Sequence, residues 1–69
     1  MEKLIGTVKT WEDGKGFGFI ESDDMDDVFV HFSGIINTRE RTLVPGQKVK
    51  FVVAPGVRGP QAALVEIED

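Results

Sequence analysis

Short runs in which large apolar residues alternate with small or polar ones most constrain how this chain can fold. Residues 15–20 read KGFGFI and residues 28–32 read VFVHF. Successive side chains of a β-strand point to opposite faces, so each run separates its rings from the residues between them. No window of about 11 residues or more carries apolar residues at helical spacing, and the sequence therefore predicts strands separated by turns.

The expected strands are few and short. They lie at about residues 3–11, 16–22, 27–32, 48–53 and 61–68, with a single helical turn at 33–36 and a turn in APGVRGP, residues 54–60. Five short strands with polar turns and no covering helices predict an all-β closed barrel rather than a layered α/β domain. At 69 residues and without cysteine, the chain is expected to form one domain over 1–69, of marginal stability.

Parity along the strands predicts what lies inside the barrel. A small barrel has one interior, and branched aliphatic residues suit it. The set expected inside is Val8, Ile20, Val28, Val30, Val49, Phe51 and Val53. The residues of opposite parity, expected outside, are Lys9, Trp11, Phe17, Phe19, Phe29 and His31. The alternative parity would bury the rings, but it would also bury Lys9 and His31, which cores rarely accept.

Net charge alone argues against a partner rich in phosphate. The chain holds 12 acids and 8 bases, a formal charge of −4, whereas nucleic-acid-binding domains are usually basic. Five of the acids lie within ESDDMDD, residues 21–27, and three lie in the last four residues. The rest of the chain is basic, so the distribution of charge leaves a nucleic-acid partner open.

An outer face on which flat rings are interleaved with basic side chains suits single-stranded nucleic acid. Every base has a π-face, and each stack on an aromatic side chain is worth about 1–3 kcal/mol. The basic residues nearest the rings in sequence are Lys9 and Lys15, and Arg58 is a further candidate for a basic residue on this face. Few phosphate contacts predict a shallow dependence of affinity on salt.

Three motifs in order carry a family resemblance. KGFGFI at 15–20, DDVFVHFS at 26–33 and RGPQA at 58–62 resemble the cold-shock domain of bacterial cold shock proteins, which is related to eukaryotic Y-box proteins. The resemblance covers essentially the whole chain. It implies a five-stranded antiparallel closed barrel of the OB (oligonucleotide/oligosaccharide-binding) type that binds single-stranded RNA and DNA with low sequence specificity. It also implies an RNA chaperone and regulator of transcription or translation in the cold-shock response.

The same resemblance implies the binding residues. Stacking rings are expected at Phe17, Phe19, Phe29, His31 and Phe32, and basic residues beside them at Lys9, Lys15 and Arg58. Asp27 is expected to accept a hydrogen bond from the edge of a nucleobase. The family usually reads Lys-Trp-Phe where this chain has KTW, so Thr10 replaces a tryptophan and Trp11 follows it. Alternation points Trp11 outward, whereas coiling of the strand would rotate it, and its stacking role stays open.

Other functions find less support. Catalysis would rest on His31 and the two serines, without cysteine or an orienting acid, and Ser33 is expected to cap the turn after Phe32 instead. DDMDD lacks the glycine and glutamate of a calcium loop. We therefore expect no enzyme activity, metal or cofactor. The serious alternative is a barrel that docks a proline-rich peptide on its rings.

Location and assembly are expected to be simple. No apolar run approaches the roughly 20 residues that span a bilayer, and residues 1–10 lack the apolar segment of a signal peptide. We expect a cytoplasmic protein without a membrane partner. It should be mostly monomeric, with a weak or domain-swapped dimer left open by the exposed rings.

Overall fold

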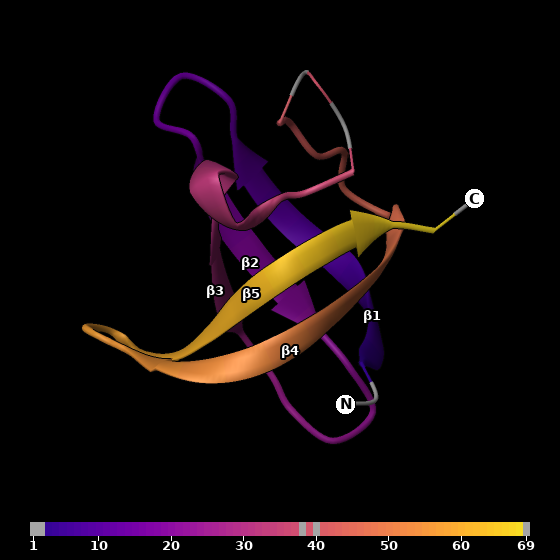
Figure 1. Ribbon diagram of the computed structural model, residues 1–69, viewed down its shortest axis with the longest axis vertical. Coiled ribbons are helices and arrows are strands. Elements are labelled where there is room, and N and C mark those ends of the chain that lie inside the picture. Colours follow the sequence, from indigo (N-terminus) through magenta and orange to yellow (C-terminus); the bar gives the residue numbers. More distant parts are fainter. Residues whose placement is uncertain (1–2, 38, 40, 69) are drawn as a thin grey trace.

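The strands wrap into a barrel in the computed structural model, which describes residues 3–37, 39 and 41–68. Figure 1 shows the elements in chain order: β1 Leu4–Glu12, β2 Phe17–Glu21, β3 Val28–His31, the 3₁₀ turn η1 Phe32–Gly34, β4 Lys48–Gly56 and β5 Gly59–Ile67. Each predicted strand is present, and the helical turn begins one residue earlier than expected. Among the described residues, no helix is long and apolar enough to cross a membrane.

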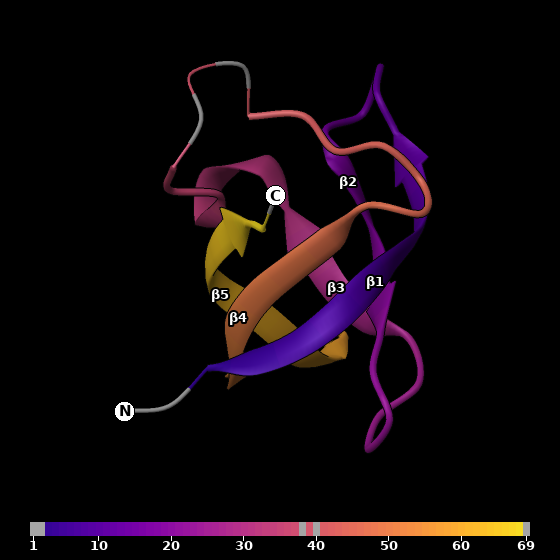
Figure 2. The same ribbon diagram turned by 90° about the vertical axis from the view of Figure 1, so that its right-hand side faces the viewer.

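Closure of the sheet follows the order β1-β2-β3-β5-β4. The predicted all-β, five-stranded closed barrel is confirmed. Four of its pairings are antiparallel, but β3 and β5 pair in parallel at one register position, Phe29 with Gln61. Figure 2 shows β1 and β4 crossing in front of β5 and β3, with the interior enclosed between them.

The last two strands are longer than predicted. Residues expected to form an open turn continue the β4–β5 ladder as far as the pair Gly56 and Gly59, which leaves only Val57 and Arg58 between the strands. This two-residue connection makes a hairpin arm, defined here as residues 54–61. Figure 1 shows the arm projecting beyond the barrel, at the left of the view.

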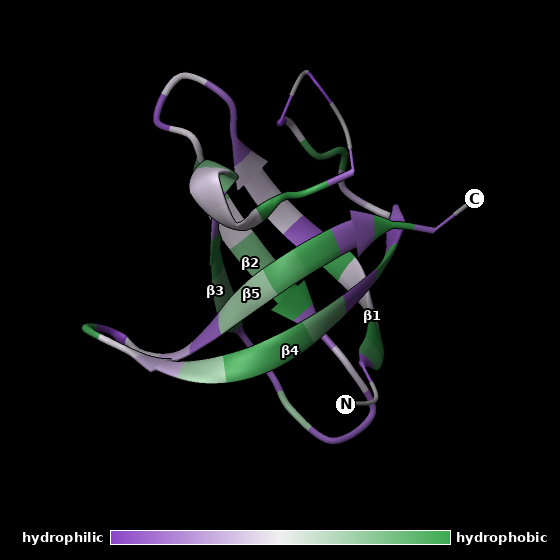
Figure 3. Cartoon of the chain, in the orientation of Figure 1, coloured by the Kyte–Doolittle hydropathy of each residue, from purple (hydrophilic) through white to green (hydrophobic). Residues whose placement is uncertain are grey.

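Branched aliphatic side chains fill the interior, as parity predicts. Six of the seven residues expected inside are buried, and the core also takes in four residues from the connection and the last strand, Ile35, Leu43, Ala62 and Val65. Full burial of each large apolar side chain stabilises the fold by about 1.5–3 kcal/mol. Figure 3 shows the complementary pattern, with hydrophilic residues gathered in the connections.

Val53 is the exception, and its predicted burial is wrong. It is 38% exposed, although its partner Ala62 across the ladder is buried. The pairing of β4 with β1 ends at Phe51. Beyond that point β4 leaves the barrel wall with β5, so Val53 lies outside the enclosed core.

Candidate nucleic-acid interface

Rings gather on the outer side of β2 and β3. The register places Phe17 opposite His31 and Phe19 opposite Phe29, while Ile20 pairs with Val28 on the inner side. Ile20, Val28 and Val30 are fully buried, whereas the four outer rings are half-buried. The predicted parity is thus confirmed and the swapped one excluded. We call the set Phe17, Phe19, Phe29, His31 and Phe32 the aromatic face.

The rings of the aromatic face support one another without closing into a flat stack. The Phe17 and Phe29 centroids lie 5.6 Å apart with a 36° tilt, and Phe19 meets Phe29 edge-on at 5.9 Å. His31 and Phe32 lie 4.5 Å apart. Aromatic pairs of this kind contribute about 0.5–1.5 kcal/mol beyond burial. Their orientation is therefore set before any ligand arrives.

Backbone geometry at the start of β2 places Phe32 beside the other rings. The Phe32 N–H donates to the Gly16 carbonyl over 2.9 Å, and Gly16 has a φ of +73°. A Cβ at Gly16 would lie 2.8 Å from the Phe32 ring. A glycine is needed there both for the left-handed backbone and for the approach of the ring. Phe32 remains 40% exposed.

His31 has a structural role besides its place among the rings. Its Nδ1 accepts a hydrogen bond from the Ser33 N–H over 3.2 Å and lies 2.8 Å from the Ser33 hydroxyl. The prediction that Ser33 caps the turn is therefore wrong, because His31 is the cap of η1.

Trp11 does not point outward, and alternation failed here because β1 contains a bulge. Val8 pairs with Ile20 and Thr10 with Phe19, so Lys9 is an extra residue without a partner in β2. One extra residue reverses the parity of the rest of the strand. Trp11 consequently pairs with Gly18 and packs against the core, while Thr10 takes the exposed position opposite Phe19.

Asp13 connects Trp11 to the long connection before β4. Its Oδ1 accepts a hydrogen bond from Thr42 Oγ1 over 2.8 Å and from Trp11 Nε1 over 3.4 Å. This carboxylate links the β1–β2 turn to the connection before β4, yet nothing in the sequence singled it out. Residues 13 and 42 are distant in sequence, and only closure of the barrel brings them together.

Two predicted polar residues meet in an exposed ion pair. Lys9 Nζ lies 2.8 Å from Asp27 Oδ1, and both side chains are exposed. The hydrogen bond and the negative charge of Asp27 raise the pKa of Lys9 above its ordinary value. Asp27 has a φ of +51° and directly precedes β3, so the ion pair joins the bulge of β1 to the start of β3.

The other two predicted basic residues lie in two different connections. Lys15 is exposed in the turn before β2, close to Gly16. Arg58 lies on the hairpin arm, with its guanidinium carbon 5.1 Å from the Phe29 centroid and 5.5 Å from the Phe17 centroid. The sequence could not predict this contact, because it required the arm that was expected to be an open turn.

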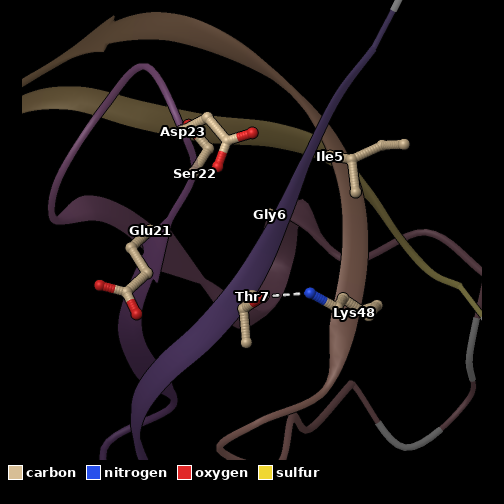
Figure 4. Close-up of a pocket in the computed structure, with 7 residues that line it drawn as sticks. All are labelled: Ile5, Gly6, Thr7, Glu21, Ser22, Asp23 and Lys48. Carbon is tan, nitrogen blue, oxygen red and sulfur yellow. Dashed lines mark hydrogen bonds between the residues drawn. The ribbon is translucent and has the colours of Figure 1, made fainter.

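A depression of about 440 Å³ lies between β1, the end of β2 and the start of β4. Figure 4 shows its lining, in which Lys48 donates to the Thr7 hydroxyl and the carboxylates of Glu21 and Asp23 stand across from it. Acidic groups repel phosphate, so this depression is a poor site for a nucleic-acid backbone. Within the part of the chain that the structure describes, no three metal-ligating side chains come together.

Comparisons with known proteins agree with this arrangement. Residues 4–67 match the family described as "'Cold-shock' DNA-binding domain". The cold shock-like protein CspC of Bacillus cereus is 55% identical over 62 residues, 90% of this chain and 95% of that protein. The cold shock-like protein CspB of Escherichia coli is 53% identical over 68 residues, covering 97% and 96% of the two chains.

A solved structure supports the architecture independently. The Drosophila Unr structure described as CSD456 superposes with a TM-score of 0.79 and covers 99% of this chain and 27% of its own, at 23% sequence identity. At that identity the likeness concerns the fold alone. It agrees with the strand order and closure described above.

Proposed function

Because the chain belongs to the cold-shock domain family, we propose that it binds single-stranded RNA and DNA with low sequence specificity by stacking bases on the aromatic face. The observation that carries this proposal is the set of half-buried rings on β2 and β3, which tilt against one another and stay open to solvent. Every base presents a π-face, so such a surface accepts many sequences.

Stacking supplies most of the affinity in this proposal. Three or four stacks at about 1–3 kcal/mol each offset the ordering of a flexible strand. Phosphates are left to Lys15 and Arg58 together with Lys9, whose charge is already opposed by Asp27. With two to four phosphate contacts, the slope of log K against log salt is expected to be about −1.5 to −3.

The same free energy of base stacking supports a role as an RNA chaperone. A protein that traps unpaired bases shifts weak hairpins toward the single-stranded form without a specific sequence signal. We therefore propose that it acts as a cytoplasmic, mostly monomeric, non-enzymatic regulator of transcripts in the cold-shock response. Asp27 is proposed to accept a hydrogen bond from a base edge, in exchange for its contact with Lys9.

Binding of labelled oligonucleotides tests the proposal. Fluorescence anisotropy with heptathymidine and with a duplex of equal length should show preference for the single strand. Phe29→Ala should weaken single-strand binding by about 5- to 150-fold, the factor that corresponds to one lost stack. Ile36→Ala, which also truncates an exposed apolar side chain but lies in the connection, serves as the matched control.

Two results would contradict the proposal. One is equal affinity for single and double strands that Phe29→Ala leaves unchanged. The other is binding of a proline-rich peptide, competed by neither oligonucleotide, which would favour the peptide-docking alternative.

A further inference from the structure

Arg58 occupies the place where a base would stack. Its guanidinium carbon lies over both the Phe29 and the Phe17 rings, within the distance of about 6 Å at which a cation is attracted to an aromatic face. Both rings are half-buried on the barrel wall, so each offers solvent one side. A base and the guanidinium therefore compete for the same open surface.

The hairpin arm that carries Arg58 is lightly held. In the described sheet, β5 pairs with β3 only at Gln61. Gly59 and Pro60, the arm residues of β5 that precede Gln61, have β4 as their sole strand partner there. In the arm, Pro55 lies opposite Pro60, and neither has an N–H to donate to the ladder. The arm is therefore weakly attached to the barrel, and the contact of Arg58 with the rings adds to this attachment. A ligand can replace the Arg58 contact without disturbing the barrel.

We propose that Arg58 is a specificity-determining residue that makes the aromatic face select charged strands over neutral aromatic ligands. This inference rests on the proposed function. A ligand that stacks on Phe17 or Phe29 must displace the guanidinium and lose its cation–π contact. A phosphodiester strand offers the displaced guanidinium a phosphate, in a charge-assisted hydrogen bond that replaces that contact. An uncharged aromatic ligand offers nothing in return.

Two oligonucleotides that carry the same bases on a charged and on a neutral backbone separate these effects. Heptathymidine with a phosphodiester backbone and heptathymidine with a neutral methylphosphonate backbone are each titrated against the wild type, Arg58→Ala and Arg58→Lys. Lys50→Ala is the matched control, because Lys50 is another cation of β4–β5 that pairs with Glu68 away from the rings.

Arg58→Ala is expected to change the two affinities in opposite directions. It should weaken binding of the charged strand severalfold and tighten binding of the neutral strand by about two- to fivefold, the factor that corresponds to one exposed cation–π contact. Arg58→Lys should bind the charged strand more tightly than Arg58→Ala does, because it keeps a cation for phosphate. Lys50→Ala should leave the ratio of the two affinities unchanged.

Proton NMR gives a second readout that is independent of affinity. In the free protein, the Arg58 side-chain protons above the rings should be shifted upfield by ring currents, and they should move downfield as heptathymidine is added.

Weaker or unchanged binding of the neutral strand by Arg58→Ala would overturn the inference while leaving the proposed function intact. Failure of the wild type to bind the charged strand at all would overturn both.

Discussion

The indole of Trp11 fills the space that a side chain at Gly18 would need. A Cβ at that position would overlap the Thr10 carbonyl oxygen and would stand 2.9 Å from the indole Cε3. The glycine between two outward rings is thus required by the residue on the neighbouring strand, and the bulge at Lys9 is what places Trp11 there.

Gly18→Ala is therefore expected to destabilise the barrel. The added methyl group meets backbone atoms that cannot move without disturbing the β1–β2 pairing, and overpacking of this kind costs about 1–3 kcal/mol. Urea unfolding followed by circular dichroism measures the change. Gly14→Ala is the control, since a Cβ there would meet nothing within 4 Å. Equal stability of the two variants would show that the strands separate more easily than described.

Thr10→Trp should strengthen single-strand binding. Thr10 is exposed opposite Phe19, which is where a further ring would extend the aromatic face. One added stack of about 1–3 kcal/mol corresponds to at least a fivefold gain in affinity for heptathymidine. Trp11→Phe, which keeps an aromatic ring against the core, should change that affinity much less. The opposite order of effects would place the functional ring at Trp11.

Glu66→Gln should make the stability of the folded protein depend less on pH in the acid range. A hydrogen bond from Lys3 and its positive charge hold the pKa of Glu66 below its ordinary value of 4.5. A carboxyl group with a lowered pKa stabilises the folded state above pH 4.5. This contribution is lost as the pH falls through the pKa that Glu66 has in the folded protein. Thermal unfolding between pH 3 and 6 measures the slope. Glu12→Gln, which removes another exposed glutamate carboxylate at the end of β1, is the control.

Asp13 and Thr42 should show a coupled effect on stability. Their hydrogen bond ties the β1–β2 turn to the long connection. A double-mutant cycle with Asp13→Ala and Thr42→Val should give a coupling of about 0.5–1.5 kcal/mol, the net worth of one hydrogen bond. Asp13→Ala should also shift Trp11 emission, because it removes the acceptor of the indole N–H. Strictly additive effects would mean that the hydrogen bond contributes nothing to stability.

Period-two alternation was enough to predict the barrel and the outward rings. It was reliable in β2 and β3 because their pairing is regular, from Phe17 with His31 to Ile20 with Val28. It failed for Trp11 because a bulge leaves no clear mark in sequence. It failed for Val53 because β1 begins at Leu4, opposite Phe51, and gives β4 no partner beyond that residue in the described sheet.

Contacts across the barrel could not be read from the sequence either. The Lys9–Asp27 pair, the Asp13–Thr42 hydrogen bond and the position of Arg58 over the rings each join residues that lie far apart in the sequence. Residue types at these sites were informative about chemistry. Their partners depended on register, which local pattern does not determine.

The parallel pairing of β3 with β5, through Phe29 and Gln61, has a consequence for the order of folding. The meander of β1 to β3 and the hairpin of β4 and β5 each pair strands that follow one another, whereas β1 with β4 and β3 with β5 join distant segments. Local pairings form faster, because they close shorter loops. We therefore expect the rings of β2 and β3 to be brought side by side in the early meander, and the barrel to close afterwards beside a face that is already assembled.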